Sequence, residues 1–309
     1  MDLFNAILKN ANTKNTWSQW VATSSDPAAA STRECLHTCF SGIPSGRRRD
    51  VLKKLRTGDV AEVEATLHHL VAHELLRRLN LDPEWEPDIG DLTPDLAFRS
   101  SDIRFIGEVF VTHSPARTLV DYSDGTGEAW DTSKPSESRA KKIADRLEEK
   151  IAKYKRLNEP LVLFAFLGDH RILRTSHFEN ALYGRTAGEA EPGEYFPEVG
   201  RAPIRWGGIL LPQNDGQMPH EHLSAVVVLD WFDTRKSNDP GKRLHALVLH
   251  HWAPTTLLSP KVFEPFCQLI WKGQYLRWSP SYTKDQPIVA KFLSNDDLKF
   301  SPYSVNNPW

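Results

Sequence analysis

The chain has 309 residues, of which 40% are hydrophobic, so it can bury a sizeable core as one large domain or two ordinary ones. A formal net charge of -2 excludes a globally basic nucleic-acid-binding protein but leaves room for a local basic groove. Three cysteines are too few for a disulfide framework, and the sequence has neither a secretory signal nor an apolar stretch that could span a membrane. We therefore expect a cytoplasmic protein.

The N-terminal part predicts an extension followed by a basic helix. Residues 1–45 form the predicted extension, with one weak helix and then the small, polar run "ATSSDPAAASTREC". The next segment, "SGRRRDVLKKLRTGD", has helical apolar spacing with basic residues around it. Its basic side chains are either a solvated helix face or a nucleic-acid-binding patch that contacts phosphates. The candidate phosphate-binding residues are Arg47, Arg48, Arg49, Lys53 and Lys54.

The next elements predict an α/β core. Apolar residues at spacings of three and four indicate a long helix over residues 60–79, which ends at the turn-rich "NLDPEWEPDIGD". Two strands, "DLAF" and "IRFIGEVFV", follow as a hairpin joined by "RSSD". A charged helix over residues 138–157 then precedes "PLVLFAFLG", which is typical of a buried strand. This order predicts a central mixed β-sheet flanked by helices.

The second half of the chain predicts further strands, at "GGILLP", "LSAVVVLDWF" and "LHALVLHHW". They complete the same sheet or pack on it as a second layer. We prefer a single integrated domain over residues 46–309, with a core at 47–168 and a C-terminal elaboration at 169–309.

Two carboxylates in the hairpin are the first candidate functional residues. Asp95 lies at the start of one strand, and Glu108 lies within its apolar neighbour. Alternate side chains of a strand face the same way, so these two groups can point into one space. Two such carboxylates can hold Mg²⁺, which lowers the pKa of a bound water and neutralises charge on a phosphate under attack. A carboxylate inside an apolar strand is costly without a partner, which favours a site over a chance placement.

The helix, the Pro94-Asp95 strand start and the Glu108 strand together resemble the PD-(D/E)XK nuclease superfamily, over roughly residues 47–168. The resemblance implies a restriction-endonuclease-like core and a Mg²⁺-dependent nuclease. The pair Pro87-Asp88 competes for the motif, but a clean apolar run follows only Asp95. This chain departs from the pattern because Phe110 stands where the family has a lysine.

The missing lysine is predicted to come from the following helix. In branches of the superfamily, a Gln or Lys on this helix precedes a Tyr, and the segment from Lys150 to Tyr154 resembles that pattern. Ile143, Leu147, Lys150 and Tyr154 lie at the repeat of one buried helix face, so Lys150 is expected to point inward. Lys153 is expected to face water.

The helix before the hairpin leaves its contribution open. Glu64 shares an apolar face and is a plausible metal ligand, whereas His69 stands where relatives carry an acid. A site with two carboxylates alone would bind metal weakly or prefer Mn²⁺. His69, His73 and Glu74 also suggest a zinc site, although their order does not match His-Glu-x-x-His.

Together these features predict a Mg²⁺-dependent endonuclease that acts on DNA, with Asp95, Glu108 and Lys150 as its catalytic residues. A role in restriction or antiviral defence is associated with the superfamily. A homodimer or partner proteins encoded elsewhere are compatible with it. The alternative is a catalytically inert nuclease-like module that has lost its lysine at Phe110 and binds nucleic acid or a partner protein.

Overall fold

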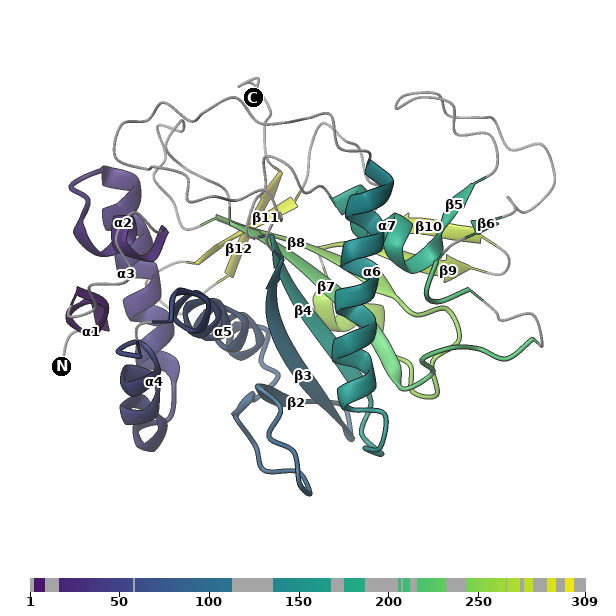
Figure 1. The fold of residues 1–309 in the computed structure, drawn as a ribbon, viewed down its shortest axis with the longest axis horizontal. Helices are drawn as coiled ribbons and strands as arrows, with labels where there is room; N and C mark the ends of the chain where they lie inside the picture. Colours follow the sequence, from purple (N-terminus) through teal and green to yellow (C-terminus); the bar gives the residue numbers. More distant parts are fainter. Residues whose placement is uncertain are drawn as a thin grey trace.

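The fold is that of a computed structural model (Figure 1). It describes residues 3–8, 17–57, 59–112, 136–167, 175–186, 205–206, 208–211, 216–231, 243–264, 266–272, 275–279, 288–292 and 298–302. Among them, no helix is both long enough and apolar enough to cross a lipid bilayer.

The N-terminal part is helical. Its elements are α1 (Leu3–Leu8), α2 (Trp17–Thr23), α3 (Pro27–Gly42), a 3-10 turn (Ser45–Arg47), α4 (Arg48–Lys54) and α5 (Val60–Arg78). The longest helix, α5, begins at Asp59, whose carboxylate accepts hydrogen bonds from the backbone N–H groups of Ala61 and Glu62. This cap starts the helix where its apolar spacing starts, so the predicted basic helix and the predicted long helix are both confirmed.

The sheet is mixed and, in the described part of the chain, ten-stranded. Its main path runs β1-β2-β3-β4-β7-β8-β11-β12, and β9 and β10 extend it from β8. The pairs β3–β4, β4–β7 and β8–β9 are parallel, and the others are antiparallel. The strands are β1 (Glu84–Trp85), β2 (Leu96–Ser100), β3 (Ile103–Thr112), β4 (Leu161–Leu167), β7 (Leu223–Trp231), β8 (Arg243–His250), β9 (Cys267–Lys272), β10 (Tyr275–Ser279), β11 (Ile288–Phe292) and β12 (Leu298–Pro302).

Two further helices cover the face of the sheet opposite to the N-terminal helices. The crossover from β3 to its parallel neighbour β4 contains α6 (Ser136–Lys153), and α7 (Thr175–Tyr183) packs beside it. The remaining elements are a small separate ribbon of β5 (Arg185–Thr186) and β6 (Arg205–Trp206), and a 3-10 turn (Pro260–Phe263). Helices α1 to α5 lie on one side of the sheet and α6 and α7 on the other (Figure 1).

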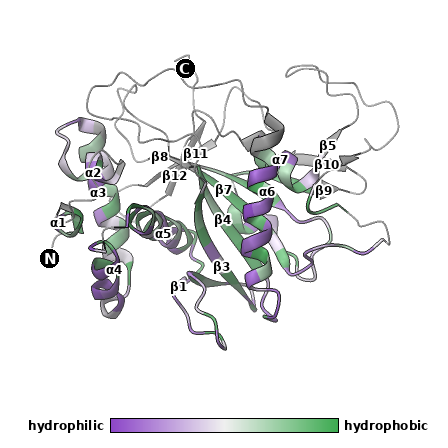
Figure 2. Cartoon of the chain, viewed as in Figure 1, coloured by the Kyte–Doolittle hydropathy of each residue, from purple (hydrophilic) through white to green (hydrophobic). Residues whose placement is uncertain are grey.

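The core consists of two hydrophobic clusters, one on each face of the sheet. In β3, Phe105 and Val109 pack on the α5 side, whereas Ile106 and Phe110 pack on the α6 side. All residues of β4 are buried, as expected for a parallel strand covered on both faces. Figure 2 shows the central strands as mainly hydrophobic, with hydrophilic stretches along α4 and α6. The α/β core with a central mixed sheet flanked by helices is thus confirmed.

The predicted secondary structure of residues 1–45, one weak helix followed by a small, polar run, is wrong in the described part of that segment. The polar run belongs mostly to α3, a helix of 16 residues, and α1 and α2 precede it. Cys35, Leu36, Cys39 and Ile43 are buried in the same hydrophobic cluster as α5. Their spacing of three and four is helical, but the many small and polar residues between them concealed it. A domain boundary at residue 45 stays a prediction.

The strands β7 to β12 join the first-half strands in one sheet, which decides between the two arrangements that the sequence left open. β7 pairs with β4 in parallel and continues into the antiparallel pair with β8. The segment "GGILLP" is the exception, because in its described part, residues 208–211, it forms no strand.

Candidate active site

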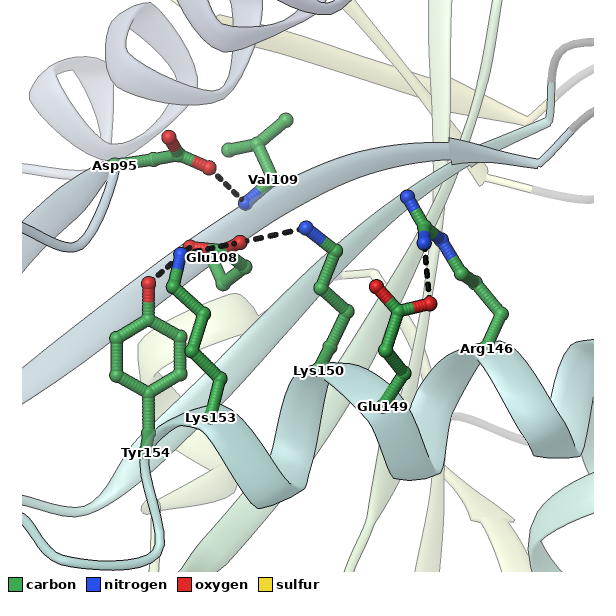
Figure 3. Close-up of polar contacts among 8 residues, drawn as sticks. All are labelled: Asp95, Glu108, Val109, Arg146, Glu149, Lys150, Lys153 and Tyr154. Atoms are coloured by element: carbon green, nitrogen blue, oxygen red, sulfur yellow. Dashed lines mark hydrogen bonds and ion pairs between the residues drawn. The ribbon is translucent and has the colours of Figure 1, made fainter.

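The β2–β3 hairpin places Asp95 beside Glu108. Its register pairs Leu96 with Gly107, so the next pair of positions is Asp95 and Glu108. Ser101 adopts a positive φ of 54° in the two-residue turn that fixes this register. One carboxylate oxygen of Asp95, Oδ2, accepts a hydrogen bond from the backbone N–H of Val109 at 2.7 Å (Figure 3). The carboxyl group of Asp95 is therefore tied to β3 directly beside Glu108.

Glu108 is the centre of the polar cluster. Its side chain is 3% exposed and receives polar groups from the end of α6 (Figure 3). Lys150 Nζ lies 2.8 Å from Oε1, and Lys153 Nζ lies 3.2 Å from Oε1 and 3.4 Å from Oε2. The hydroxyl of Tyr154 donates a hydrogen bond to Oε2. The negative charge of Glu108 thus faces two ammonium groups, and the uncharged phenol of Tyr154 donates a hydrogen bond to it.

The packing of α6 explains this convergence. Ile143, Leu147 and Ile151 are buried against the sheet and fix the rotation of the helix. Lys150 lies on the flank of this apolar face, with its side chain 17% exposed, and the side chain of Lys153 is 42% exposed. The predicted inward direction of Lys150 is therefore confirmed, and so is the predicted exposure of Lys153, although the ammonium group of Lys153 also contacts Glu108.

The position of the missing lysine is filled by a core side chain. Phe110 is 2% exposed and packs in the hydrophobic cluster on the α6 side of the sheet. Residues 108 and 110 share one face of β3, so a lysine at position 110 would also be covered by α6. The lysine contact with Glu108 comes from the helix instead of from the strand.

Burial and charge shift two acid groups of the site. Burial, and secondly the charge of Glu108, raise the pKa of Asp95 from 3.8 to about 7, against the opposing effects of the Val109 N–H, Lys150 and Lys153. Burial and the charge of Glu108 also raise the pKa of the Tyr154 phenol far above its ordinary value. Tyr154 therefore stays protonated and acts as a hydrogen-bond donor at neutral pH.

The two carboxylates fit a minimal Mg²⁺ site. Within the described residues there is no group of three or more His, Cys, Asp or Glu side chains that could hold a metal ion. Mg²⁺, however, is often bound by one or two carboxylates together with waters and substrate phosphates. The pKa of Asp95 is raised first by burial and secondly by the charge of Glu108, and a divalent cation between the two carboxylates would offset the repulsion between them. Asp95 and Glu108 thus fit a site that the substrate completes.

The long helix α5 does not supply a third ligand in the part of the chain that is described. Glu64 is buried in α5 but forms no three-ligand group with Asp95 and Glu108. His69 stacks on Trp85, with ring centroids 3.6 Å apart, and burial lowers its pKa. In the described residues, neither Glu64 nor His69 therefore belongs to a group of three side chains that could hold a metal ion.

The zinc alternative also lacks its ligands. The carboxylate of Glu74 is held by Arg77 at 2.8 and 3.0 Å and by Arg78 at 2.6 Å. His73 packs edge-on to Trp85, and burial lowers the pKa of its ring to about 4. Among the described residues, His69, His73 and Glu74 therefore do not form a group of three side chains that could hold a zinc ion.

The competing aspartate and the basic helix are placed differently from the hairpin site. Asp88 is exposed in the turn before β2, and Thr93 Oγ1 lies 3.4 Å from its Oδ1.

Of the predicted phosphate-binding residues, Arg47 and Arg48 donate hydrogen bonds to backbone carbonyls, and Lys54 pairs with Glu86. The remaining two, Arg49 and Lys53, are exposed. Arg47, Arg48 and Lys54 are half-buried, and phosphate binding by all five residues stays a prediction.

Sequence reasoning missed the contacts of Lys153 and of the Tyr154 hydroxyl. The available signal was their spacing, since residues three and four positions after Lys150 lie on the same side of a helix as Lys150. No protein-family model matches the chain, and neither a curated protein nor a solved structure matches it.

Proposed function

We propose that the protein is a metal-dependent endonuclease that hydrolyses phosphodiester bonds in DNA, with a restriction-endonuclease-like core. One observation carries the proposal. The half-buried carboxylate of Asp95, directly before β2, lies beside the buried carboxylate of Glu108 on β3, and the ammonium group of Lys150 reaches Glu108 at 2.8 Å. This combination of two acids and one lysine is the group that the resemblance to PD-(D/E)XK nucleases requires.

Each residue has a distinct task in the proposed reaction. Asp95 and Glu108 would hold Mg²⁺, or Mn²⁺ in its place, and the ion would supply an activated water and neutralise phosphate charge. Lys150 would orient that water or neutralise charge on the phosphate under attack. Tyr154 keeps Glu108 in place, because its buried hydroxyl donates to the carboxylate and does not ionise at neutral pH.

Exposed basic side chains support a nucleic acid as the substrate. Lys153 is 42% exposed at the edge of the site, and Arg49 and Lys53 are exposed on α4, on the other side of the sheet from α6 (Figure 1). Such lysine and arginine side chains contact backbone phosphates without reading sequence. A place in a restriction or antiviral defence system, with a homodimer or other partner proteins, is part of the proposal only through the superfamily resemblance.

A catalytically inert module that binds nucleic acid or a partner protein is the second candidate. The observation in its favour is that both oxygens of Glu108 already accept polar contacts, from Lys150, Lys153 and Tyr154. A carboxylate with this many donors is satisfied without a metal ion. In that case the cluster would serve only to stabilise the packing of α6 on the sheet.

Cleavage of supercoiled plasmid and circular single-stranded DNA separates the two candidates. The assay compares Mg²⁺ and Mn²⁺ with EDTA, for the wild type and for Asp95→Asn, Glu108→Gln and Lys150→Met. Lys142→Met is the matched control, because Lys142 is an exposed lysine on the same helix. The endonuclease proposal requires metal-dependent cutting that the three site variants lose and Lys142→Met retains. DNA binding without cutting under either metal would support the inert module.

A further inference from the structure

Glu108 has no free coordination position for a metal ion as long as all its present contacts remain. Oε1 accepts from Lys150 and Lys153, and Oε2 accepts from Tyr154 and, at 3.4 Å, from Lys153. A carboxylate offers about four lone pairs, and these contacts use them. A divalent cation at Glu108 would also lie beside two ammonium groups in a buried place. One of the three donors therefore has to leave before the ion binds.

Lys153 is the donor that can leave at the lowest cost. Its contacts, at 3.2 and 3.4 Å, are longer than the 2.8 Å contact of Lys150. Its side chain is 42% exposed, against 17% for Lys150, and it is the last residue of α6. Tyr154 is fully buried and uncharged, so it neither repels a cation nor has water to move into.

We infer that Lys153 is a displaceable counterion of Glu108, which neutralises the carboxylate in the metal-free protein and moves to a nucleic-acid phosphate when a divalent cation takes its place. The inference rests on the proposed function and adds a residue that the resemblance does not supply. The exchange needs no covalent step, because the divalent cation replaces the ammonium group of Lys153 as the positive charge beside Glu108.

The destination of Lys153 follows from its position. A lysine ammonium on a flexible four-carbon chain can swing from Glu108 to the adjacent surface without moving the helix. Phosphate oxygens of a bound strand would lie at this surface if the metal ion contacts the same strand. Lys153 would then contribute to DNA affinity only in the metal-bound state, and Lys150 would remain at the site in both states.

The first test measures metal binding in the absence of DNA. The metal-free protein is titrated with Mn²⁺ at pH 8.5, where Asp95 is ionised, and free Mn²⁺ is followed by electron paramagnetic resonance. Lys153→Met should lower the Kd for Mn²⁺ by about threefold to tenfold, because it removes a competing positive charge a few ångströms away. Lys153→Arg keeps the charge, and Lys155→Met removes an exposed lysine two residues further along. Both should leave the Kd near the wild-type value.

The second test measures binding of a short fluorescein-labelled duplex by anisotropy, in Ca²⁺ and in EDTA. Lys153→Met should raise the DNA Kd about threefold or more in Ca²⁺ and leave it unchanged in EDTA. An equal loss in both conditions would show a static phosphate contact and overturn the exchange.

The outcomes separate this inference from the proposed function. A wild-type protein that binds Mn²⁺ and cuts DNA, with an unchanged or higher Mn²⁺ Kd in Lys153→Met, refutes the displaceable counterion alone. A wild-type protein that neither binds Mn²⁺ nor cuts DNA refutes both proposals. Circular dichroism of each folded variant ensures that a lost signal is not lost structure.

Discussion

Asp95→Asn is expected to stabilise the folded protein at alkaline pH while it removes one of the two proposed metal ligands. In the folded protein the pKa of Asp95 is raised to about 7, mainly by burial and secondly by Glu108. Between about pH 4 and pH 7 the folded state therefore binds more protons than the unfolded chain, so the stability of the wild type falls as pH rises. An asparagine carries no charge and avoids this loss.

The magnitude follows from the shifted pKa. The difference between about 7 and the ordinary value of 3.8 corresponds to about 4 kcal/mol in the free energy of unfolding. About 2 to 3 kcal/mol of this is lost between pH 5 and pH 8, since the unfolded carboxyl ionises below that interval. The amide oxygen of the asparagine can still accept the Val109 N–H, but its new NH₂ group needs a partner, which costs about 1 kcal/mol. We therefore expect Asp95→Asn to be more stable than the wild type by about 1–3 kcal/mol at pH 8.

Urea unfolding in EDTA, at pH 5 and pH 8, measures both quantities. Asp91→Asn is the matched control, because Asp91 is an exposed aspartate in the turn before β2. It should leave the pH dependence of the wild type unchanged. If the stabilities of the wild type and Asp95→Asn changed in parallel from pH 5 to pH 8, the Asp95 carboxyl would not be the group that destabilises the folded state, and the electrostatic account of the site would be wrong.

Three further predictions test other contacts of the site and of α4. Mg²⁺ or Mn²⁺ at about 100 times its Kd should stabilise the wild type at pH 8 by about 3 kcal/mol; thermal unfolding of Glu108→Gln should show no such gain. Tyr154→Phe removes the hydroxyl that donates to buried Glu108 and should cost about 1–3 kcal/mol in urea unfolding; an unchanged midpoint would contradict that role. Lys53→Met should weaken DNA binding and reduce its salt dependence, whereas Lys54→Met, which loses an ion pair with Glu86, should not; equal effects would contradict the distinction between them.

The local patterns of the sequence predicted the elements that carry the site. The hairpin, the buried strand β4 and the two long helices all follow from periodicity and turn residues, because each depends on short-range spacing. The inward direction of Lys150 follows from the same logic, as it lies within the repeat of Ile143, Leu147 and Tyr154. These predictions held because a helix face is fixed by residues within a few turns of one another.

The features that escaped prediction depend on contacts between distant segments. The second lysine contact of Glu108 depends on how α6 docks on β3 and on where it ends, and neither follows from the spacing of Lys153 alone. The stacking of His69 on Trp85 joins the middle of α5 to β1. Lys54 pairs with Glu86 across 32 residues, a contact that composition alone does not reveal. Each of these contacts is set by packing in three dimensions.

The helical origin of Lys150 has a physical consequence for the core. Position 110 faces the cluster under α6, and a phenylalanine there contributes apolar surface that a lysine would not. The ammonium group of Lys150 reaches the same carboxylate from the edge of that cluster, where its side chain keeps partial access to water. A helix also presents positions three and four residues apart on one side, so it can place a second lysine and a tyrosine on Glu108 together. A lysine on β3 would offer one side chain to Glu108, whereas α6 and the residue that follows it supply three.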